Sequence, residues 1–364
     1  MSTAGPPQGA KAPLEGRDLH AVKGRVGDIR APRTKVQRRP LHGVLLLDKP
    51  LGLSSNDALQ KAKWLLRAEK AGHTGTLDPL ATGVLPLCFG AATKFSQLQL
   101  DADKTYEATL RLGIKTTTAD AEGDVTAERP VNITAAQVGE VIKRFTGPIA
   151  QVPPMYSALK KDGKALYEYA RDGIDVVREA RHVIIHSLEL VQAPADWSQA
   201  SELKIRVSCS KGTYIRTLGE DIGEALGCGA HLSALRRTGT GGFVASQCVT
   251  LEALEAMTES GRQACLMPTE SLLTGHTPVT LDEDNAGRFL SGLRRRGNWP
   301  DATQVSVFGT SPHALLGSAH IKAGELIPGR LLSPLEIGQL LDQQADQQTG
   351  QQATFQQIQE SATS

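Results

Sequence analysis

The sequence has few cysteines and no long apolar run, and each absence excludes a class of protein. Its 364 residues include five cysteines, and no two of them form a C-x-x-C pair. This spacing argues against a zinc site and against a disulfide framework, and it fits a reducing compartment. No run approaches the ~20 apolar residues of a membrane span, and no apolar segment of a secretory signal stands near the N-terminus. We therefore expect a cytoplasmic protein without membrane contact.

Charge is distributed unevenly along the chain. The formal net charge is only +1, yet residues 1–39 carry nine Lys or Arg against three acidic residues. Residues 336–364 carry four acidic residues and no Lys or Arg. A basic N-terminal arm binds a polyanion such as nucleic acid, or it is simply a solvated tail. Charge alone leaves both interpretations open.

Composition divides the chain into four segments. Residues 1–40 are rich in Pro, Gly, Lys and Arg and lack apolar periodicity, so we expect a disordered arm. Residues 41–275 contain the periodic segments of a large α+β domain, and short strand-like pieces predict a small β-rich domain over 276–333. The glutamine-rich segment 334–364 has too little apolar material to fold alone. We expect it to be disordered, although a short helix could start at Pro334.

Apolar periodicity predicts the main elements of the large domain. In chain order they are a buried strand at 43–50, a helix from Ser55 to about Lys70, a loop at 71–88, an alternating strand at 105–113, a helix at 133–147 that begins with a capping box, an alternating strand at 201–217, and a helix to about Leu226.

The loop AGHTGTLDPLATGVLPLC contains one carboxylate, Asp78, among glycines and threonines. Its glycines do not form G-x-G-x-x-G, and no Gly-Lys-Ser/Thr follows, which excludes both common phosphate-binding loops. No partner lies near enough in sequence to complete a metal site with His73 and Asp78. Asp78 is then either a nucleophile or base held in an exposed turn, or a turn residue that bonds to its own backbone. The loop alone favours the second interpretation.

The segment KGTYIRT offers a partner for this carboxylate. In a strand, Tyr214 and Arg216 would share the face opposite the apolar residues Leu203 and Ile205. An arginine that points into a pocket needs an anion, and Asp78 would serve. We expect such a pair to lower the pKa of Asp78, and we expect Tyr214 to offer a platform for a base or sugar. The alternative is a surface Tyr and Arg on an edge strand.

A basic segment with interleaved aromatic residues follows at about 150–180. This composition is typical of a flap that faces nucleic acid, and an amphipathic helix would show much the same pattern. Its basic residues are Lys160, Lys161, Lys164 and Arg171, and its tyrosines are Tyr156, Tyr167 and Tyr169.

Taken in chain order, these segments resemble the TruB family of bacterial tRNA pseudouridine-55 synthases. The resemblance runs through residues 42–275 and continues more weakly to about 333. Its most specific motifs are HTGTLDPLATG and KGTYIRT, supported by GVLLLDKPLGLSSNDAL, QVPPMYSALKKDGKALYEYARDG and CSKGTYIRTLGEDIGEALGCGAHLSALRRT. Residues 1–40 and the glutamine-rich tail have no counterpart in the family.

The resemblance implies a fold and a reaction. The fold is a mixed, mainly antiparallel sheet flanked by helices, with an RNA-gripping insert at about 150–180 and a C-terminal PUA-like domain. The reaction converts uridine 55 in the T-loop of tRNA to pseudouridine, with no cofactor and no metal. We expect tRNA as the partner, a monomeric protein, and no obligatory protein partner.

The resemblance also implies roles for seven residues. Asp78 would be the catalytic nucleophile, with Arg216 as its ion-pair partner. The other expected roles are stacking on the flipped base by Tyr106, lining of the pocket by Tyr214, an apolar wall from Leu235, entry into the T-loop by His73, and support of the site from the LDKP turn by Lys49.

Two alternatives share these motifs. One is an RNA chaperone that opens and refolds the T-loop without chemistry, a role that could also accompany catalysis. The other is the catalytic subunit of a pseudouridine synthase that depends on a guide RNA. The Lys- and Tyr-rich insert favours an enzyme that recognises its RNA without a guide.

Overall fold

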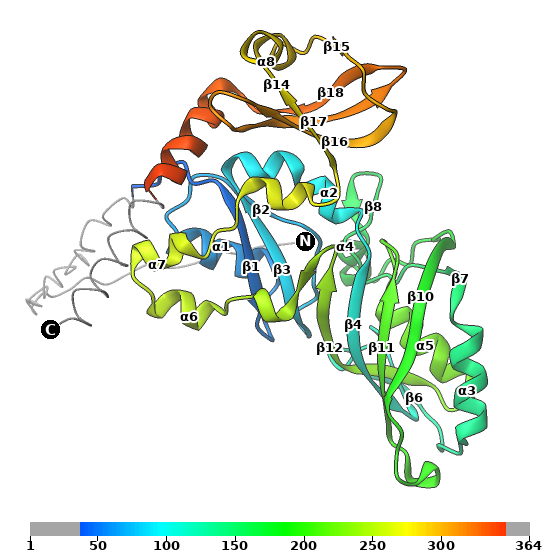
Figure 1. Ribbon diagram of the computed structural model, residues 1–364. Coiled ribbons are helices and arrows are strands. Elements are labelled where there is room, and N and C mark those ends of the chain that lie inside the picture. Colours follow the sequence, from blue (N-terminus) through cyan, green and yellow to red (C-terminus); the bar gives the residue numbers. More distant parts are fainter. Residues whose placement is uncertain (1–36, 347–364) are drawn as a thin grey trace, which may run out of the picture. The chain divides into compact units, whose positions relative to one another are not determined.

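The computed structural model describes residues 37–346, and its central feature is a nine-stranded sheet. The strands of this sheet are β1 (Gly43–Lys49), β2 (Ala71–His73), β3 (Ala81–Phe89), β4 (Lys104–Leu112), β7 (Gly147–Gln151), β10 (Arg181–Gln192), β11 (Glu202–Cys209), β12 (Ala230–Thr240) and β13 (Phe243–Val244). Their main order is β1-β3-β12-β4-β11-β10-β7 (Figure 1). Only β3 and β12 pair in parallel within this sheet. The sheet is mixed and mainly antiparallel, which confirms the predicted fold class.

The two alternating segments become neighbouring strands of this sheet. In β4 every second residue is buried, and β11 buries Leu203, Ile205 and Val207 in the same alternation. The strands are antiparallel, with Val207 opposite Tyr106. Strands with one buried face show this period of two, so the strand predicted at 105–113 is confirmed, and the one predicted at 201–217 is confirmed over Glu202–Cys209.

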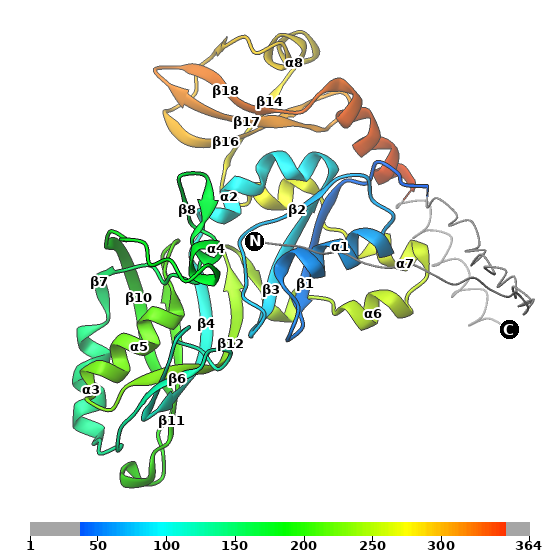
Figure 2. The same ribbon diagram turned by 180° about the vertical axis from the view of Figure 1, so that it is seen from behind.

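Three helices cover one face of the sheet: α1 (Ser55–Leu65), α3 (Ala135–Arg144) and α5 (Ile215–Ala225) (Figure 2). Their buried residues Ala58, Val138 and Leu218 share one apolar core with Leu110 of β4. The predicted capping box at the start of α3 is present, because Thr134 and Gln137 bond to each other's backbone.

Two predicted boundaries are wrong. Helix α1 ends at Leu65 rather than near Lys70, because Arg67 has a φ of 52° and the chain turns there toward β2. The loop expected over 71–88 is mostly strand, since β2 and β3 pair with each other and leave only residues 74–80 between them.

The segment KGTYIRT is not a strand, so the prediction that Tyr214 and Arg216 share one face of a strand is wrong. Strand β11 ends at Cys209, and Gly212 turns the chain with a φ of 78°. Tyr214 is the N-cap residue of α5, so Arg216 lies in the first turn of that helix. A short turn before a helix therefore decides where both side chains point.

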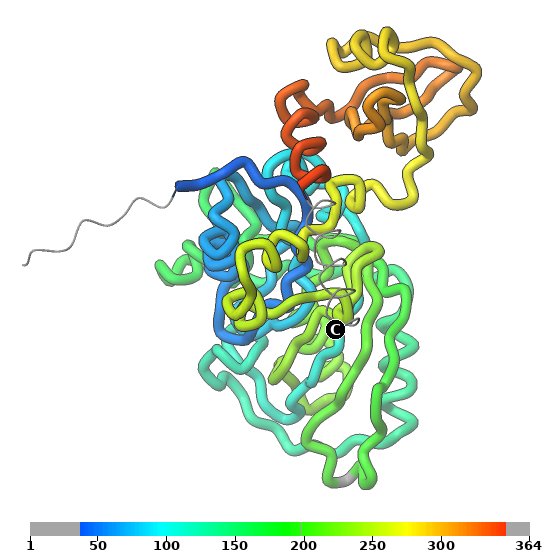
Figure 3. Tube along the Cα trace, turned by 60° about the vertical axis from the view of Figure 1, so that its left-hand side comes forward, coloured from blue at the N-terminus to red at the C-terminus, as the bar shows by residue number. Residues whose placement is uncertain are grey.

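A second sheet follows the large one in the chain, and Figure 3 shows its strands gathered in yellow and orange. Its order is β14-β16-β17-β18-β15, and Val305, Val307 and Phe289 are buried in its own apolar core. The elements are β14 (Thr277–Leu281), α8 (Glu283–Leu290), β15 (Arg295–Arg296), β16 (Ala302–Gly309), β17 (Leu315–Lys322) and β18 (Glu325–Leu331). The predicted C-terminal β domain is thus present.

Residues 334–346 are helical, so the helix that could start at Pro334 is present, and the disorder expected over 334–364 is wrong for this part of the segment. Ile337 and Leu340 pack against an apolar cluster that includes residues of β1 and β3, and Glu336 forms an ion pair with Lys94 at 2.6 Å. These tertiary contacts supply what the local composition lacks. The basic arm at 1–36 and the tail at 347–364 lie outside the described residues.

The remaining elements are short. They are η1 (Gly90–Phe95), α2 (Ser96–Leu100), β5 (Ile114–Thr116), β6 (Val125–Glu128), β8 (Lys160–Lys161), β9 (Lys164–Ala165), α4 (Leu166–Arg171), η2 (Trp197–Gln199), η3 (Ala245–Gln247), α6 (Leu251–Ala256), α7 (Glu259–Ala264) and η4 (Thr269–Leu273). No described helix has both the length and the apolar character to cross a membrane.

The parallel contact between β3 and β12 gives a stability prediction. Gly83 has a φ of 101°, and a Cβ at this position would lie 2.2 Å from the carbonyl oxygen of Arg237. Gly83→Ala should therefore lower the free energy of unfolding by about 3 kcal/mol, measured by urea denaturation.

The matched control is Gly139→Ala in the middle of α3, where an added Cβ meets nothing within 4 Å. This change should raise the free energy of unfolding by about 0.5–1 kcal/mol. Equal stability of the two variants would contradict the close approach of β3 and β12.

Candidate active site

A cavity of about 600 Å³ lies where the start of β4, the middle of β12 and the start of α5 meet. Five of the seven residues to which the resemblance assigns a role line it: Asp78, Tyr106, Tyr214, Arg216 and Leu235. They come from the loop at 74–80, β4, β12 and the start of α5. His73 and Lys49 are not among the lining residues.

Asp78 and Arg216 form an ion pair inside this cavity. Oδ2 of Asp78 lies 3.0 Å from Nε of Arg216. The Asp78 side chain is 39% exposed and that of Arg216 only 7%. The carboxylate thus faces the open cavity while its guanidinium partner is buried behind it.

The other donors of Arg216 fix its orientation. Nη2 donates to the carbonyl oxygen of Tyr156 at 2.6 Å, and Nη1 donates to the carbonyl oxygen of Thr118 at 3.3 Å. Nη1 also lies 3.5 Å from Oδ2 of Asp120, a buried carboxylate. Because every nitrogen of the guanidinium has a partner, Arg216 holds Asp78 in one direction.

The pKa of Asp78 is raised, which corrects the expectation that the ion pair would lower it. Burial raises this pKa most, Arg216 opposes the shift, and the Asp120 carboxylate raises the pKa further. The loss of hydration thus outweighs the attraction of a single guanidinium that two carboxylates share.

The start of α1 clamps the loop that carries Asp78. The Ser55 hydroxyl donates to the carbonyl oxygen of Leu77 at 3.0 Å and accepts from the Leu77 N–H at 2.7 Å. The Gly52 N–H donates to the carbonyl oxygen of Pro79 at 2.9 Å. These bonds fix the residues on both sides of the catalytic candidate.

Lys49 supports this clamp from behind the cavity. It is fully buried at the end of β1, and its Nζ donates to the carbonyl oxygens of Pro50 and Leu53 at 2.9 and 2.5 Å. Burial lowers the pKa of Lys49 to about 8, although the Asp78 charge opposes this shift. The lysine therefore fixes the turn that contacts the Asp78 loop.

The cavity walls are aromatic and aliphatic. Tyr106 is 9% exposed, and burial raises the pKa of its phenol. Leu235 on β12 lies opposite Ala108 of β4. Tyr214 is held at the start of α5 because its N–H and its carbonyl oxygen both bond to the Gln151 side chain, at 3.1 and 3.3 Å.

His73 lies on β2, opposite Leu87 of β3. Burial and the nearby Arg237 charge lower its pKa, so the neutral ring is favoured. Its Nδ1 is buried without a hydrogen-bond partner among the described residues.

Sequence reasoning missed four charged residues that line the cavity: Lys104, Asp120, Glu122 and Arg237. The alternation of side chains along a strand could have predicted Arg237, since it lies two residues after Leu235 and so on the same face of β12. Lys104 donates to three backbone carbonyls, and burial lowers its pKa to about 8. Neither Lys104 nor Asp120 lies in a motif that predicts its burial.

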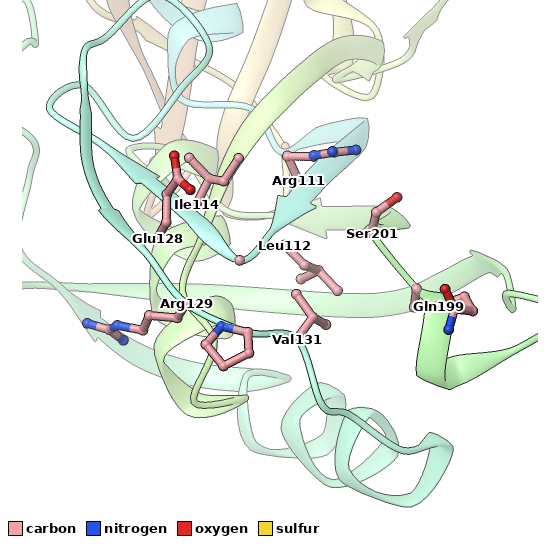
Figure 4. Close-up of a pocket in the computed structure, with 11 residues that line it drawn as sticks. Arg111, Leu112, Ile114, Glu128, Arg129, Val131, Gln199 and Ser201 are labelled. Atoms are coloured by element: carbon pink, nitrogen blue, oxygen red, sulfur yellow. The ribbon is translucent and has the colours of Figure 1, made fainter.

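A second hollow of about 540 Å³ lies at the other end of β4 (Figure 4). In Figure 4, Arg111 and Arg129 point to opposite sides of it. Arg111 pairs with Glu202 and Arg129 with Glu224, and all four side chains are about two-fifths exposed. Because these are solvated pairs rather than an open carboxylate on a buried partner, the Asp78 cavity is the better candidate. Within residues 37–346, no cluster of three or more His, Cys, Asp or Glu could hold a metal ion.

Two family models match adjoining parts of the chain, which together span residues 63–274. Residues 63–215 match the TruB family pseudouridylate synthase N-terminal domain, and residues 216–274 match the tRNA pseudouridylate synthase B C-terminal domain. The chain belongs to the TruB family. It is an isomerase that converts uridine to pseudouridine in tRNA, as the resemblance implied.

Curated relatives in this family span nearly the same length. The tRNA pseudouridine synthase B of Verminephrobacter eiseniae is 66% identical over 324 residues, which cover 87% of this chain and 97% of that one. The enzyme of the same name from Ralstonia nicotianae is 58% identical over 305 residues, with 82% and 97% covered.

Solved structures of similar fold include Cbf5 in a Cbf5-Nop10-Gar1 complex. This match has 26% identity and a TM-score of 0.60, and it covers 83% of this chain and 87% of that one. A chain of an H/ACA RNP bound to a substrate RNA containing 2′-deoxyuridine shares the fold at 24% identity. Its TM-score is 0.58, with 80% and 86% covered.

The raised pKa of Asp78 predicts the position of the acid limb in the pH profile of pseudouridine formation. Activity that needs the ionised carboxylate should fall at a higher pH than an ordinary aspartate would give. Asp120→Asn removes a neighbouring negative charge, so it should move this limb to lower pH. Single-turnover rates on tRNA across pH measure the limb.

Asp124→Asn serves as the control, since it removes an exposed carboxylate from the same loop. Its acid limb should match that of the unsubstituted enzyme. An unchanged limb in Asp120→Asn would show that Asp120 does not set the pKa of the group on which the limb depends.

Proposed function

We propose that this enzyme isomerises uridine 55 in the T-loop of tRNA, with Asp78 as its catalytic residue and without cofactor or metal. One observation carries the proposal: Asp78 opens to the cavity while the buried Arg216 holds its carboxylate. The enzyme acts as a monomer on free tRNA in the cytoplasm and needs no protein partner.

The reaction itself explains why one carboxylate suffices. The N1–C1′ bond of the uridine breaks, the base rotates, and a C5–C1′ bond forms. The base loses the proton at C5 and carries one at N1 in the product, so atoms and electrons balance without water or oxidant. Asp78 forms a covalent adduct with the nucleotide or promotes a glycal intermediate, and its ionised form serves either route.

The target base must leave the loop before it can react. Extrusion of a nucleotide costs a few kcal/mol. Stacking of a base on an aromatic ring contributes ~1–3 kcal/mol, so Tyr106 offsets much of this cost. Leu235 and Tyr214 enclose the base, and the cavity volume of about 600 Å³ is within the range of small-ligand pockets.

His73 fills the space that the extruded nucleotide leaves in the T-loop. Burial and the Arg237 charge lower its pKa, which favours the neutral ring. Lys49 keeps its supporting role behind Asp78.

The segment at about 150–180 grips the RNA beside the cavity. Tyr156, Tyr167 and Arg171 line the cavity, while Lys160 and Lys161 of the β8–β9 hairpin are exposed. This arrangement offers cations to phosphates next to the entry of the base. The β14–β18 sheet is a PUA-like domain that contacts the RNA elsewhere.

Asp78→Asn should abolish pseudouridine formation on purified tRNA transcript, because the amide cannot act as a nucleophile or base. We expect a loss of at least ~10³-fold in single-turnover rate, with tRNA affinity kept within a few-fold. Chemical mapping of pseudouridine by position should place the product of the unsubstituted enzyme at position 55.

Asp57→Asn, which replaces an exposed carboxylate in the first turn of α1, is the control and should stay active. Product formed by Asp78→Asn would refute the assignment of the catalytic residue. No product from the unsubstituted enzyme on bare tRNA would instead favour a guide-dependent enzyme. Refolding of misfolded tRNA by Asp78→Asn would support an additional chaperone role.

Lys160→Ala and Lys161→Ala should weaken tRNA binding in a salt-dependent way. Each lost phosphate contact should reduce the slope of log affinity against log salt by about 1. Lys143→Ala, at an exposed position on α3, is the matched control and should keep the slope. Unchanged slopes in all three variants would remove the β8–β9 hairpin from the RNA interface.

A further inference from the structure

Arg237 is the largest of the fully buried side chains and lines the cavity that contains Asp78. It is 1% exposed. Within residues 37–346 it forms no ion pair with a carboxylate at 4.0 Å or less. Burying a guanidinium without a carboxylate partner costs folding free energy unless its N–H groups find other acceptors. We therefore ask which groups Arg237 contacts and what those contacts do.

Its strand places Arg237 between the two strands on which the site depends. In the parallel pairing Arg237 lies opposite Gly83 of β3, and in the antiparallel pairing it lies opposite Tyr106 of β4. The missing side chain of Gly83 permits this approach, since a Cβ there would meet the Arg237 backbone. The Arg237 side chain therefore starts between β3, which follows the Asp78 loop, and β4, which carries Tyr106.

The guanidinium of Arg237 bonds both to β3 and to the loop that carries Asp78. Nε donates to the carbonyl oxygen of Val84 on β3 at 2.7 Å. Nη2 donates to the carbonyl oxygen of Gly75, in the loop that carries Asp78, at 3.5 Å. Tyr106, directly opposite Arg237 on β4, lines the same cavity, and the Arg237 charge opposes the rise in the pKa of Tyr106 that burial causes.

We propose that Arg237 is a positioning residue for pseudouridine formation, joining the Asp78 loop to Tyr106 so that carboxylate and ring keep a fixed separation. This inference rests on the roles proposed for those two residues. Arg216 fixes the carboxylate from one side of the cavity, and Arg237 fixes the loop and the stacking ring from the other. A planar guanidinium does this because its N–H groups diverge toward the carbonyl oxygens of Val84 and Gly75 while its charge lies opposite Tyr106, a fixed geometry that an ammonium group does not have.

Arg237→Lys should lower kcat on tRNA by about 100-fold, because small misplacements of a reacting group cost rates of this order. KM should change less than about threefold, since Lys160 and Lys161, proposed to contact phosphates, lie outside the cavity that Arg237 lines. In the Tyr106→Phe background the same change should cost clearly less, because the hydroxyl whose pKa the Arg237 charge affects is already gone.

Arg236→Lys is the matched control on the same strand. Arg236 pairs with Asp48 at 2.7 and 3.0 Å and does not line the cavity. Its replacement should leave kcat within about twofold. Urea unfolding of each variant separates lost catalysis from lost folding.

A spectroscopic readout tests the contact without activity. With tyrosine labelled by ¹³C at the ring Cζ, the Tyr106 resonance should shift in Arg237→Lys and stay in place in Arg236→Lys. The reverse test, for the case that Arg237→Lys does not fold, is the ¹⁵N resonance of the Arg237 Nε. It should shift in Tyr106→Phe and stay unchanged in Tyr169→Phe.

Unchanged resonances, or a folded Arg237→Lys with normal kcat, would overturn the proposal. Losses that multiply independently in the double variant would also overturn it, because they would show no coupling through Tyr106. Failure of the proposed catalytic role is distinguishable: Asp78→Asn would then be active while the Tyr106 and Arg237 resonances still responded to each other.

Discussion

The ion pair between Asp78 and Arg216 is the interaction on which the site depends. It joins a loop near the start of the domain to a helix 138 positions further along the chain (216 − 78). Backbone carbonyls and Asp120 fix the guanidinium, so the carboxylate has one orientation. Buried pairs of this kind contribute little to stability because desolvation offsets the attraction. Their value here is a single carboxylate held at the wall of a cavity.

The sheet supplies the geometry around this pair. Strand β12 lies between β3 and β4, so it faces the strand after the Asp78 loop on one side and the strand with Tyr106 on the other. Leu235 and Arg237 both point from β12 into the cavity that these neighbours share. The start of α5 brings Arg216 to the same place. A reaction that only moves a base on its sugar needs little more than this: one carboxylate, an aromatic surface and exclusion of bulk water.

Local patterns predicted the parts of the fold that local physics decides. The alternation in β4 and β11 and the capping box of α3 were confirmed, because buried faces and caps leave a signature within a few residues. The resemblance identified the family and directed attention to Asp78 and Arg216. The prediction that Tyr214 and Arg216 share one face of a strand was wrong, because the chain turns at Gly212 after the strand and Tyr214 caps a helix. The pKa of Asp78 and the burial of Asp120 depend on partners far away in sequence, which no local pattern records; the helix at 334–346 could be expected to start at Pro334, but its packing against β1 and β3 could not.

The most direct test is a map of pseudouridine in cellular tRNA after the chromosomal codon for Asp78 is changed to asparagine. The account predicts that pseudouridine disappears from position 55 of the T-loop and persists at every other modified position. Restoration of the aspartate codon should return it. Pseudouridine that remained at position 55 would contradict the central claim that the carboxylate held by Arg216 performs the isomerisation.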